Sequence, residues 1–159
     1  MMSAARVPLS SPSATVALGA RIARVLEPHD LVLLSGDLGA GKTYLARALL
    51  RELGVPEEEA IASPTFSLVN EYDTDIGPVL HVDLYRLREP GIDMANEVRR
   101  LGLRERRAEG AIVLVEWGEG AETLFGAQPP ALVVALAAIA AEERVASLSG
   151  PKAHAVAAE

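Results

Sequence analysis

The sequence predicts a single domain of the α/β class, with a mostly parallel sheet flanked by helices and an antiparallel C-terminal hairpin. Apolar segments of strand length alternate with amphipathic segments of helix length through the first two thirds of the 159 residues. A glycine-rich segment, 36–43, joins one such strand to one such helix. The chain has no internal repeat, low-complexity tract or linker, so we expect one domain over residues 1–159.

The first third of the chain is predicted to form a helix, a buried strand and a second helix. Residues 15–26 gather apolar side chains on one helical face, and Pro28 closes this segment. Residues 31–34 are uniformly apolar, as in a parallel strand covered on both faces. A helix then runs from Thr43 to a C-terminal cap at Gly54. The inward-facing residues would be Val16, Ala20, Ala23 and either Ile22 or Leu26 in the first helix, and Leu45, Ala46, Leu49, Leu50 and Leu53 in the second.

The remaining strands are predicted from alternation and from short apolar runs. The expected strands are 65–72, 79–83, 111–116, 132–136 and 144–148. The first of them would place Phe66, Leu68, Asn70 and Tyr72 on one face, and its other face would be solvated. Residues 73–78 have the composition of a turn, and the last two strands would pair antiparallel. We expect residues 1–12 and 150–159 to be frayed.

Composition and charge exclude several classes of function. Half of the residues are apolar, which is ordinary for a globular chain, and the net charge of −7 argues against a broad basic surface for nucleic acid. There is no cysteine, so disulfides, zinc–thiolate sites and thiol nucleophiles are excluded. The N-terminus has no apolar signal-peptide core, and the longest apolar run, 131–141, is shorter than the ~20 residues that span a bilayer. We therefore expect a cytoplasmic protein without a membrane partner.

The glycine-rich segment has the pattern of a P-loop, which binds the phosphates of a nucleotide. It consists of Gly36, Asp37, Leu38, Gly39, Ala40, Gly41, Lys42 and Thr43. Its glycines let the backbone N–H groups wrap around the phosphates, and the N-terminus of the following helix favours an anion. Lys42 would contact the β- and γ-phosphates, and the Thr43 hydroxyl would bind Mg²⁺. The sequence therefore predicts ATP and Mg²⁺ as cofactors on a P-loop NTPase-like fold.

Two carboxylates are candidates for the chemistry beside the loop. Asp83 and Glu116 each end an apolar strand, and the carboxyl ends of neighbouring parallel strands meet at one edge of a sheet. One would hold Mg²⁺ directly or through water, and the other would polarise the attacking water. The spacing does not assign these roles.

Three further features have more than one interpretation. Ser63-Pro64-Thr65 either initiates a strand or forms a hydroxyl-bearing loop that senses the γ-phosphate. His81 is interpreted as a packed strand residue rather than a ligand. A basic cluster is either a solvated helix face, a lid or a patch that binds a partner; it comprises Arg99, Arg100, Arg104, Arg106 and Arg107.

Four segments together resemble the TsaE family, over about residues 13–149. They are the P-loop, Ser63-Pro64-Thr65-Phe66, Asp83-Leu84-Tyr85-Arg86-Leu87 and Val115-Glu116-Trp117, in this order. TsaE is the ATPase component of bacterial tRNA threonylcarbamoyladenosine biosynthesis. The resemblance implies slow ATP hydrolysis that the TsaB–TsaD heterodimer activates. It also implies that turnover resets this complex, which modifies adenosine 37 of tRNAs reading codons that begin with A.

The resemblance also implies roles for individual residues. Lys42 would contact phosphate, Thr43 and Glu116 would ligate magnesium, and Asp83 would serve catalysis or its gating. Thr65 would lie in a switch-like loop, and Trp117 would lie beside the nucleotide. The tRNA would be contacted only indirectly, through the partner complex.

Two other functions are compatible with a P-loop. A small kinase would need an acceptor pocket and arginines such as those of the basic cluster, but it would leave Ser-Pro-Thr-Phe and Glu-Trp without a role. A nucleotide-gated interaction module would hydrolyse ATP only incidentally. A GTPase is disfavoured because no Asn-Lys-x-Asp motif is present.

Overall fold

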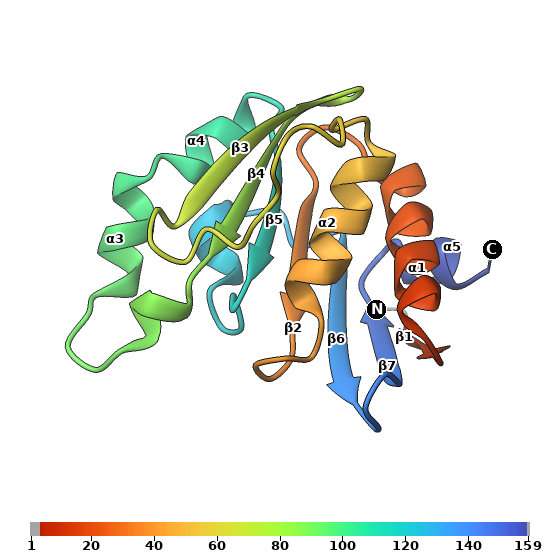
Figure 1. Ribbon diagram of the computed structural model, residues 1–159. Coiled ribbons are helices and arrows are strands. Elements are labelled where there is room, and N and C mark those ends of the chain that lie inside the picture. Colours follow the sequence, from red (N-terminus) through yellow and green to blue (C-terminus); the bar gives the residue numbers. More distant parts are fainter. Residues whose placement is uncertain (1–3, 159) are drawn as a thin grey trace.

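A seven-stranded mixed sheet forms the centre of the protein, which a computed structural model describes over residues 4–158 (Figure 1). The strand order is β1-β7-β6-β2-β5-β4-β3. The elements are β1 (Ala4–Leu9), α1 (Pro12–Val25), β2 (Leu31–Ser35), α2 (Lys42–Glu52), β3 (Val69–Thr74), β4 (Gly77–Asp83), the 3₁₀ turn η1 (Tyr85–Arg88), α3 (Met94–Arg100), α4 (Leu103–Ala108), β5 (Ile112–Glu116), the 3₁₀ turn η2 (Glu122–Phe125), β6 (Leu132–Ala138), β7 (Arg144–Ser149) and α5 (Ala153–Ala157).

The predicted α/β class is confirmed, and the sheet is parallel only at its centre. Strands β6, β2, β5 and β4 are mutually parallel neighbours. β3 pairs antiparallel with β4 at one edge, and β7 and β1 add an antiparallel pair at the other. The C-terminal hairpin β6–β7 is antiparallel, as expected. Both edges are therefore closed by antiparallel strands: β3 and β7 are joined to their neighbours by hairpins, whereas β1 comes from the N-terminal part of the chain.

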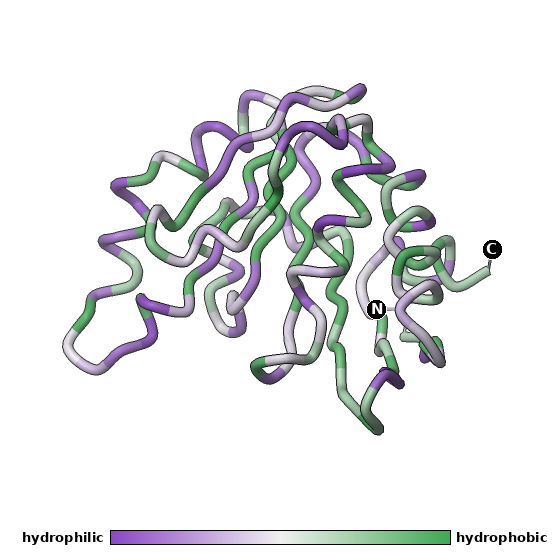
Figure 2. The backbone as a smooth tube through the Cα atoms, in the orientation of Figure 1, coloured by the Kyte–Doolittle hydropathy of each residue, from purple (hydrophilic) through white to green (hydrophobic). Residues whose placement is uncertain are grey.

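Two hydrophobic cores lie on the two faces of the sheet. Alternate residues of the central strands supply both, so that Val32 and Leu34 of β2 face one core and Leu31 and Leu33 face the other. Helices α1, α2 and α5 cover the first face. Helices α3 and α4 cover the second together with the two 3₁₀ turns. Figure 2 shows the hydrophobic strands at the centre and the polar connections around them.

Helix α2 buries the face predicted for it, and α1 does so only in part. The five expected residues of the second helix are all buried, and Gly54 follows α2 with a φ of +102°. In the first helix Ile22, Ala23 and Leu26 are buried, but Val16 is 45% exposed. Leu18 and Gly19 are buried instead, and Gly19 packs so closely against α2 that an added Cβ would lie 2.7 Å from Ala48 Cβ. Close helix packing, rather than apolar side chains alone, therefore sets the buried face of α1.

The strand expected over residues 65–72 begins four residues later, which is a correction. Residues 65–68 form turns, the Leu68 N–H donates to the Pro64 carbonyl at 2.8 Å, and Leu68 has a φ of +69°. This left-handed conformation interrupts an extended chain. Phe66, expected on one strand face, is 85% exposed. Strand β3 then runs to Thr74, so the predicted turn at 73–78 is confined to the residues around Asp75 and Ile76.

The termini are also better ordered than expected. Residues 4–9 form β1, which pairs with β7, and Leu9 is buried. The other end forms α5, whose Ala153 and Val156 are buried in the first core. Lys152 donates to the Val25 carbonyl at 2.6 Å and to Asp30 at 2.7 Å. The expectation of frayed ends is therefore wrong for residues 4–12 and 150–158, while residues 1–3 and 159 lie outside the described residues.

Within residues 4–158, no helix combines the length and the apolar character needed to cross a membrane. The cytoplasmic location stays a prediction.

Candidate functional site

The glycine-rich segment 36–43, for which we keep the name P-loop from its sequence pattern, lies between β2 and α2, at the carboxyl ends of the central strands. Gly36 has a φ of +141°, and an added Cβ would lie 2.5 Å from the Leu136 carbonyl oxygen of β6. Gly41, with a φ of +105°, is the residue from which α2 starts. A side chain at position 36 would clash with the backbone of β6. At position 41 a Cβ would make the positive φ unfavourable. The glycines thus place the loop directly over the N-terminus of α2.

Lys42 is held inside the loop by carbonyl groups of the loop itself. Its ammonium donates to the Gly36 carbonyl at 2.5 Å and to the Asp37 carbonyl at 2.9 Å. The ammonium also lies 4.1 Å from the centroid of the Trp117 ring, which is a cation–π distance. Burial lowers the pKa of the Lys42 ammonium, and nearby carboxylates, Glu116 first among them, oppose that shift.

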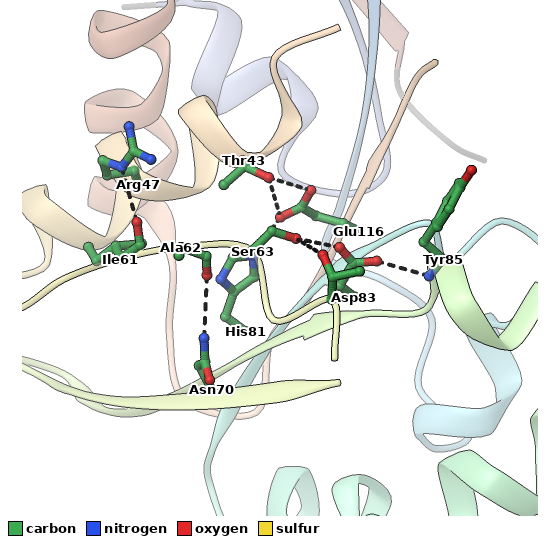
Figure 3. A network of polar contacts seen from close by, with 11 residues as sticks. Thr43, Arg47, Ile61, Ala62, Ser63, Asn70, His81, Asp83, Tyr85 and Glu116 are labelled. Carbon is green, nitrogen blue, oxygen red and sulfur yellow. Dashed lines mark hydrogen bonds and ion pairs between the residues drawn. The ribbon is translucent and has the colours of Figure 1, made fainter. Parts of the chain in front are cut away.

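The two predicted carboxylates converge at the edge of the sheet. Asp83 and Glu116 are direct neighbours in the parallel register of β4 and β5, and they are 3% and 2% exposed. The Thr43 hydroxyl lies 2.9 Å from Oε1 and 3.1 Å from Oε2 of Glu116 (Figure 3). Thr43 and Glu116, which are 73 residues apart in the sequence, therefore meet at the edge of the sheet where the carboxyl ends of the strands lie.

His81 contacts the same carboxylate from the neighbouring strand. Its Nε2 lies 2.6 Å from Glu116 Oε2, and the side chain is fully buried. Its other ring nitrogen, Nδ1, has no hydrogen-bond partner in the described part of the chain. His81 is a packed strand residue, as the sequence predicts, and it also contacts a carboxylate of the site. The period of two along β4, which puts His81 on the same face as Asp83, was the signal that could have found it.

Asp83 is engaged with the loop that precedes β3. The Ser63 hydroxyl donates to Asp83 Oδ2, and the Tyr85 N–H donates to Oδ1 at 2.9 Å. The Thr65 hydroxyl lies 3.4 Å from the Ser63 hydroxyl. The strand-initiation interpretation of Ser63-Pro64-Thr65 is wrong, since these residues form a hydroxyl-bearing loop over Asp83. Asp83 is therefore linked to this loop, whereas Glu116 is linked to Thr43.

A cavity of about 430 Å³ joins these groups. Its lining comprises Leu38, Gly39, Gly41, Lys42, Thr43, Tyr44, Ser63, Thr65, Asp83, Tyr85, Glu116 and Trp117. Trp117 has a φ of +61°, which turns its ring over Lys42, and Tyr85 meets it edge-on with ring centroids 4.9 Å apart. A left-handed residue other than glycine costs backbone energy, and such residues often occur at functional sites.

Some predicted site residues lie outside this cavity. Ala40 is buried beneath the loop, and the Asp37 side chain is exposed. Gly36 does not line the cavity, but its carbonyl accepts a hydrogen bond from Lys42. Conversely, Arg144 was missed. From β7 it donates to the Ala40 carbonyl at 3.1 Å and to the Gly39 carbonyl at 3.2 Å. No local sequence pattern marks Arg144, because its partners are more than one hundred residues away.

The basic cluster is not one surface. Arg99, Arg100 and Arg104 are exposed, whereas Arg106 forms a bidentate pair with Glu71 at 2.9 and 3.0 Å. Arg107 is buried and donates to the carbonyls of His29, Phe125, Gln128 and Pro129. Its role is to tie together the connections at the end of the sheet away from the P-loop.

The Thr43 hydroxyl and the Glu116 carboxylate are oxygen donors at a spacing that would suit a magnesium ion. Neighbouring vertices of an octahedron with metal–oxygen distances of 2.0–2.1 Å are about 2.9 Å apart. Thr43 Oγ1 and Glu116 Oε1 have this separation. Residues 4–158 contain no group of three or more His, Cys, Asp or Glu side chains that could cage a metal by themselves. Magnesium at phosphate sites typically takes one or two protein ligands and completes its shell with phosphate and water.

Comparisons with known proteins agree on one family. The family model described as threonylcarbamoyl adenosine biosynthesis protein TsaE matches residues 9–146. Proteins named tRNA threonylcarbamoyladenosine biosynthesis protein TsaE are among the similar sequences. That of Rickettsia conorii is 37% identical over 140 residues, covering 88% of this chain and 75% of the relative. That of Aquifex aeolicus is 42% identical over 111 residues, covering 70% and 74%.

A solved structure supports the architecture. The crystal structure of Bacillus subtilis YdiB superposes with a TM-score of 0.74 at 24% sequence identity, covering 99% of this chain and 94% of that one. At this identity the similarity concerns the fold.

Proposed function

The chain belongs to the TsaE family of tRNA threonylcarbamoyladenosine biosynthesis proteins, and on this premise we propose that it is a Mg²⁺-dependent ATPase of that pathway. Its partners would be TsaB and TsaD, and its turnover would reset their complex between modifications of adenosine 37 in tRNAs reading codons that begin with A. The alternative is a nucleotide-gated interaction module in which hydrolysis is incidental. The two functions differ in whether ATP turnover is needed for the tRNA modification.

The observation that carries the proposal is the meeting of Thr43 and Glu116 below the P-loop. The loop supplies backbone donors and the α2 N-terminus for the phosphates. Lys42 lies 2.5 Å from the Gly36 carbonyl, so it is already inside the loop and needs only to turn from carbonyl oxygen to phosphate oxygen. Thr43 and Glu116 then stand at the end of the phosphate chain, where charge develops during transfer.

Thr43 Oγ1 and Glu116 Oε1 would hold Mg²⁺, which would neutralise charge on the β- and γ-phosphates when bound with ATP. Asp83 is the candidate for orienting the attacking water, since it neighbours Glu116 but is hydrogen-bonded to Ser63 and Tyr85, whereas Thr43 is hydrogen-bonded to Glu116. Its bond with Ser63 links it to the Thr65 loop, which is a route by which a bound partner could change the catalytic geometry.

The nucleoside would lie on the opposite side of the loop. A hollow of about 250 Å³ there shares Gly41 and Tyr44 with the first cavity. Its lining comprises Pro12, Thr15, Ala40, Gly41, Tyr44, Ala141, Glu142 and Arg144. Because the carboxylates mark the γ-phosphate end, the rest of ATP leaves the loop towards α1 and the β6–β7 hairpin.

The test is ATP turnover by the purified chain with and without cognate TsaB–TsaD and tRNA. We expect slow hydrolysis alone and clear stimulation by the partners, because Asp83 is bound to its own loop and needs repositioning. Lys42→Ala should abolish both activities, since no other cation of the P-loop replaces it.

Absence of stimulation by TsaB–TsaD would overturn the proposed function. Phosphate transfer to a small acceptor would favour a kinase. Full support of the modification by a variant that binds ATP but does not hydrolyse it would favour the interaction module.

A further inference from the structure

We propose that His81 is a positioning residue that holds Glu116 in the orientation needed for magnesium. This inference rests on the proposed function, because it concerns the same site. His81 would act by donating from Nε2 to one carboxylate oxygen, leaving the other free to face Thr43.

The strand register explains how His81 reaches its partner. His81 pairs with Leu114 across β4 and β5, so Glu116 is two residues further along the adjacent strand and on the same face. Diagonal neighbours of this kind are within reach of long side chains. Figure 3 shows His81, Asp83 and Glu116 on one side of these strands, with Thr43 of α2 opposite.

The hydrogen-bond pattern assigns different roles to the two oxygens of Glu116. Oε2 is 2.6 Å from His81 Nε2 and 3.1 Å from the Thr43 hydroxyl. Oε1 is 2.9 Å from the Thr43 hydroxyl and has no other protein contact described. A carboxylate that ligates magnesium only accepts hydrogen bonds, so in the proposed site Nε2 would be the donor. His81 therefore occupies Oε2 and directs Oε1 towards the loop.

The rest of the histidine ring supports a role beyond packing. Its Nδ1 is buried and has no hydrogen-bond partner among residues 4–158. Burying an unpaired polar atom costs free energy, and an apolar residue at this strand position would avoid that cost. Glu116 is 2% exposed, and a buried carboxylate needs donors to compensate for lost water. The bond from His81 meets this need while keeping the carboxylate in one rotamer, as outer-shell partners of metal ligands do.

Two conservative variants separate this role from packing. In His81→Gln the side-chain amide can place an N–H near the position of Nε2, whereas in His81→Asn the amide ends near the position of Nδ1 and does not reach Glu116. His29→Gln is the control, because His29 contacts the Arg107 carbonyl at the far end of the sheet. Thermal unfolding of each variant establishes that it is folded.

The measurement is the affinity for a fluorescent, non-hydrolysable ATP analogue, first in EDTA and then across a Mg²⁺ titration. We expect His81→Asn to raise the Mg²⁺ concentration for half-maximal effect by about tenfold, with affinity in EDTA within about twofold of wild type. His81→Gln should recover most of the Mg²⁺ dependence. The double variant with Glu116→Ala should be no worse than Glu116→Ala alone, since His81 acts through that carboxylate.

Unchanged Mg²⁺ dependence in His81→Asn, or independent additive effects of the two substitutions, would overturn the inference while leaving the proposed function standing. Equal losses in EDTA and in Mg²⁺ would show a structural role and would also overturn it. If the wild-type chain itself shows no effect of Mg²⁺ on nucleotide affinity, the proposed magnesium site fails, and the role of His81 fails with it.

Discussion

At the scale of single residues, the site depends on side chains that hold the backbone of the P-loop and the neighbouring carboxylates in place. Arg144 is the clearest such residue outside the P-loop. Its guanidinium donates to the Gly39 and Ala40 carbonyls and also to three carbonyls of its own hairpin, at 140, 141 and 143. These contacts turn the loop carbonyls outwards, towards β7. Arg144 thereby helps to fix the backbone of the loop in one conformation, as pre-organised anion-binding loops require.

We expect Arg144→Ala to weaken ATP binding about tenfold. A tenfold loss corresponds to about 1.4 kcal/mol of binding free energy. The two charge-assisted hydrogen bonds that are removed can contribute more than this in favourable cases. Arg144→Lys should recover little, since a lysine cannot span both carbonyls. The measurement is calorimetric titration with ATP and Mg²⁺. Arg21→Ala is the matched control, because Arg21 also donates to a carbonyl, that of Val156, but lies away from the loop. Unaltered affinity in Arg144→Ala would refute this role.

At the scale of secondary-structure elements, the edge strand β3 is tied to α4 by an ion pair across the edge of the sheet. Arg106 and Glu71 form two hydrogen bonds, with their side chains 40% and 45% exposed. The hydrogen bond from Arg106 lowers the pKa of Glu71 from its usual value of 4.5. Exposed pairs stabilise weakly, so we expect this pair to adjust the position of β3 rather than to determine the fold.

Glu71→Gln should therefore lower the free energy of unfolding at neutral pH by less than about 1 kcal/mol. Because the folded-state pKa of Glu71 is depressed, the stabilisation is fully present above pH 4.5 and is lost as the pH falls through the folded-state pKa. Urea unfolding of both proteins between pH 7 and pH 3 tests this, with exposed Glu58→Gln as control. A difference that grows on acidification would contradict the assignment.

At the scale of the whole molecule, the balance of charge bears on the expectation that tRNA is contacted only indirectly. The net charge of the chain is −7. Of the basic cluster, Arg99, Arg100 and Arg104 are exposed, Arg106 is half-exposed but paired with Glu71, and Arg107 is buried. A net negative charge of this size opposes binding to a phosphate backbone.

We expect the isolated chain to bind tRNA more weakly than about 10⁻⁴ M at physiological salt. Fluorescence anisotropy with labelled tRNA is the measurement, with the TsaB–TsaD complex alone and together with this chain for comparison. Micromolar binding by the isolated chain that weakens steeply with added salt would show a direct tRNA surface and contradict the prediction.

Much of the site and of the central sheet could be predicted because both depend on local patterns. The P-loop spacing, the apolar runs of β2, β4 and β5, and the buried face of α2 follow from short-range periodicity. The meeting of Asp83 with Glu116 followed from one rule about the ends of parallel strands. The turn at Thr65 could not be predicted in this way, because the alternation of side chains does not reveal the left-handed Leu68 that interrupts it.

The sequence by itself thus determined the phosphate loop, the two carboxylates and the α/β class, since each is encoded within a few neighbouring residues. Only the tertiary structure decided which carboxylate meets Thr43, that His81 contacts this carboxylate, and that residues 4–9 and 153–157 are packed against the rest of the fold. The physical reason is the distance along the chain between the partners. His81 and Glu116 are 35 residues apart, and Arg144 is 104 residues from Ala40. Such contacts form only when the sheet has brought its strand ends together.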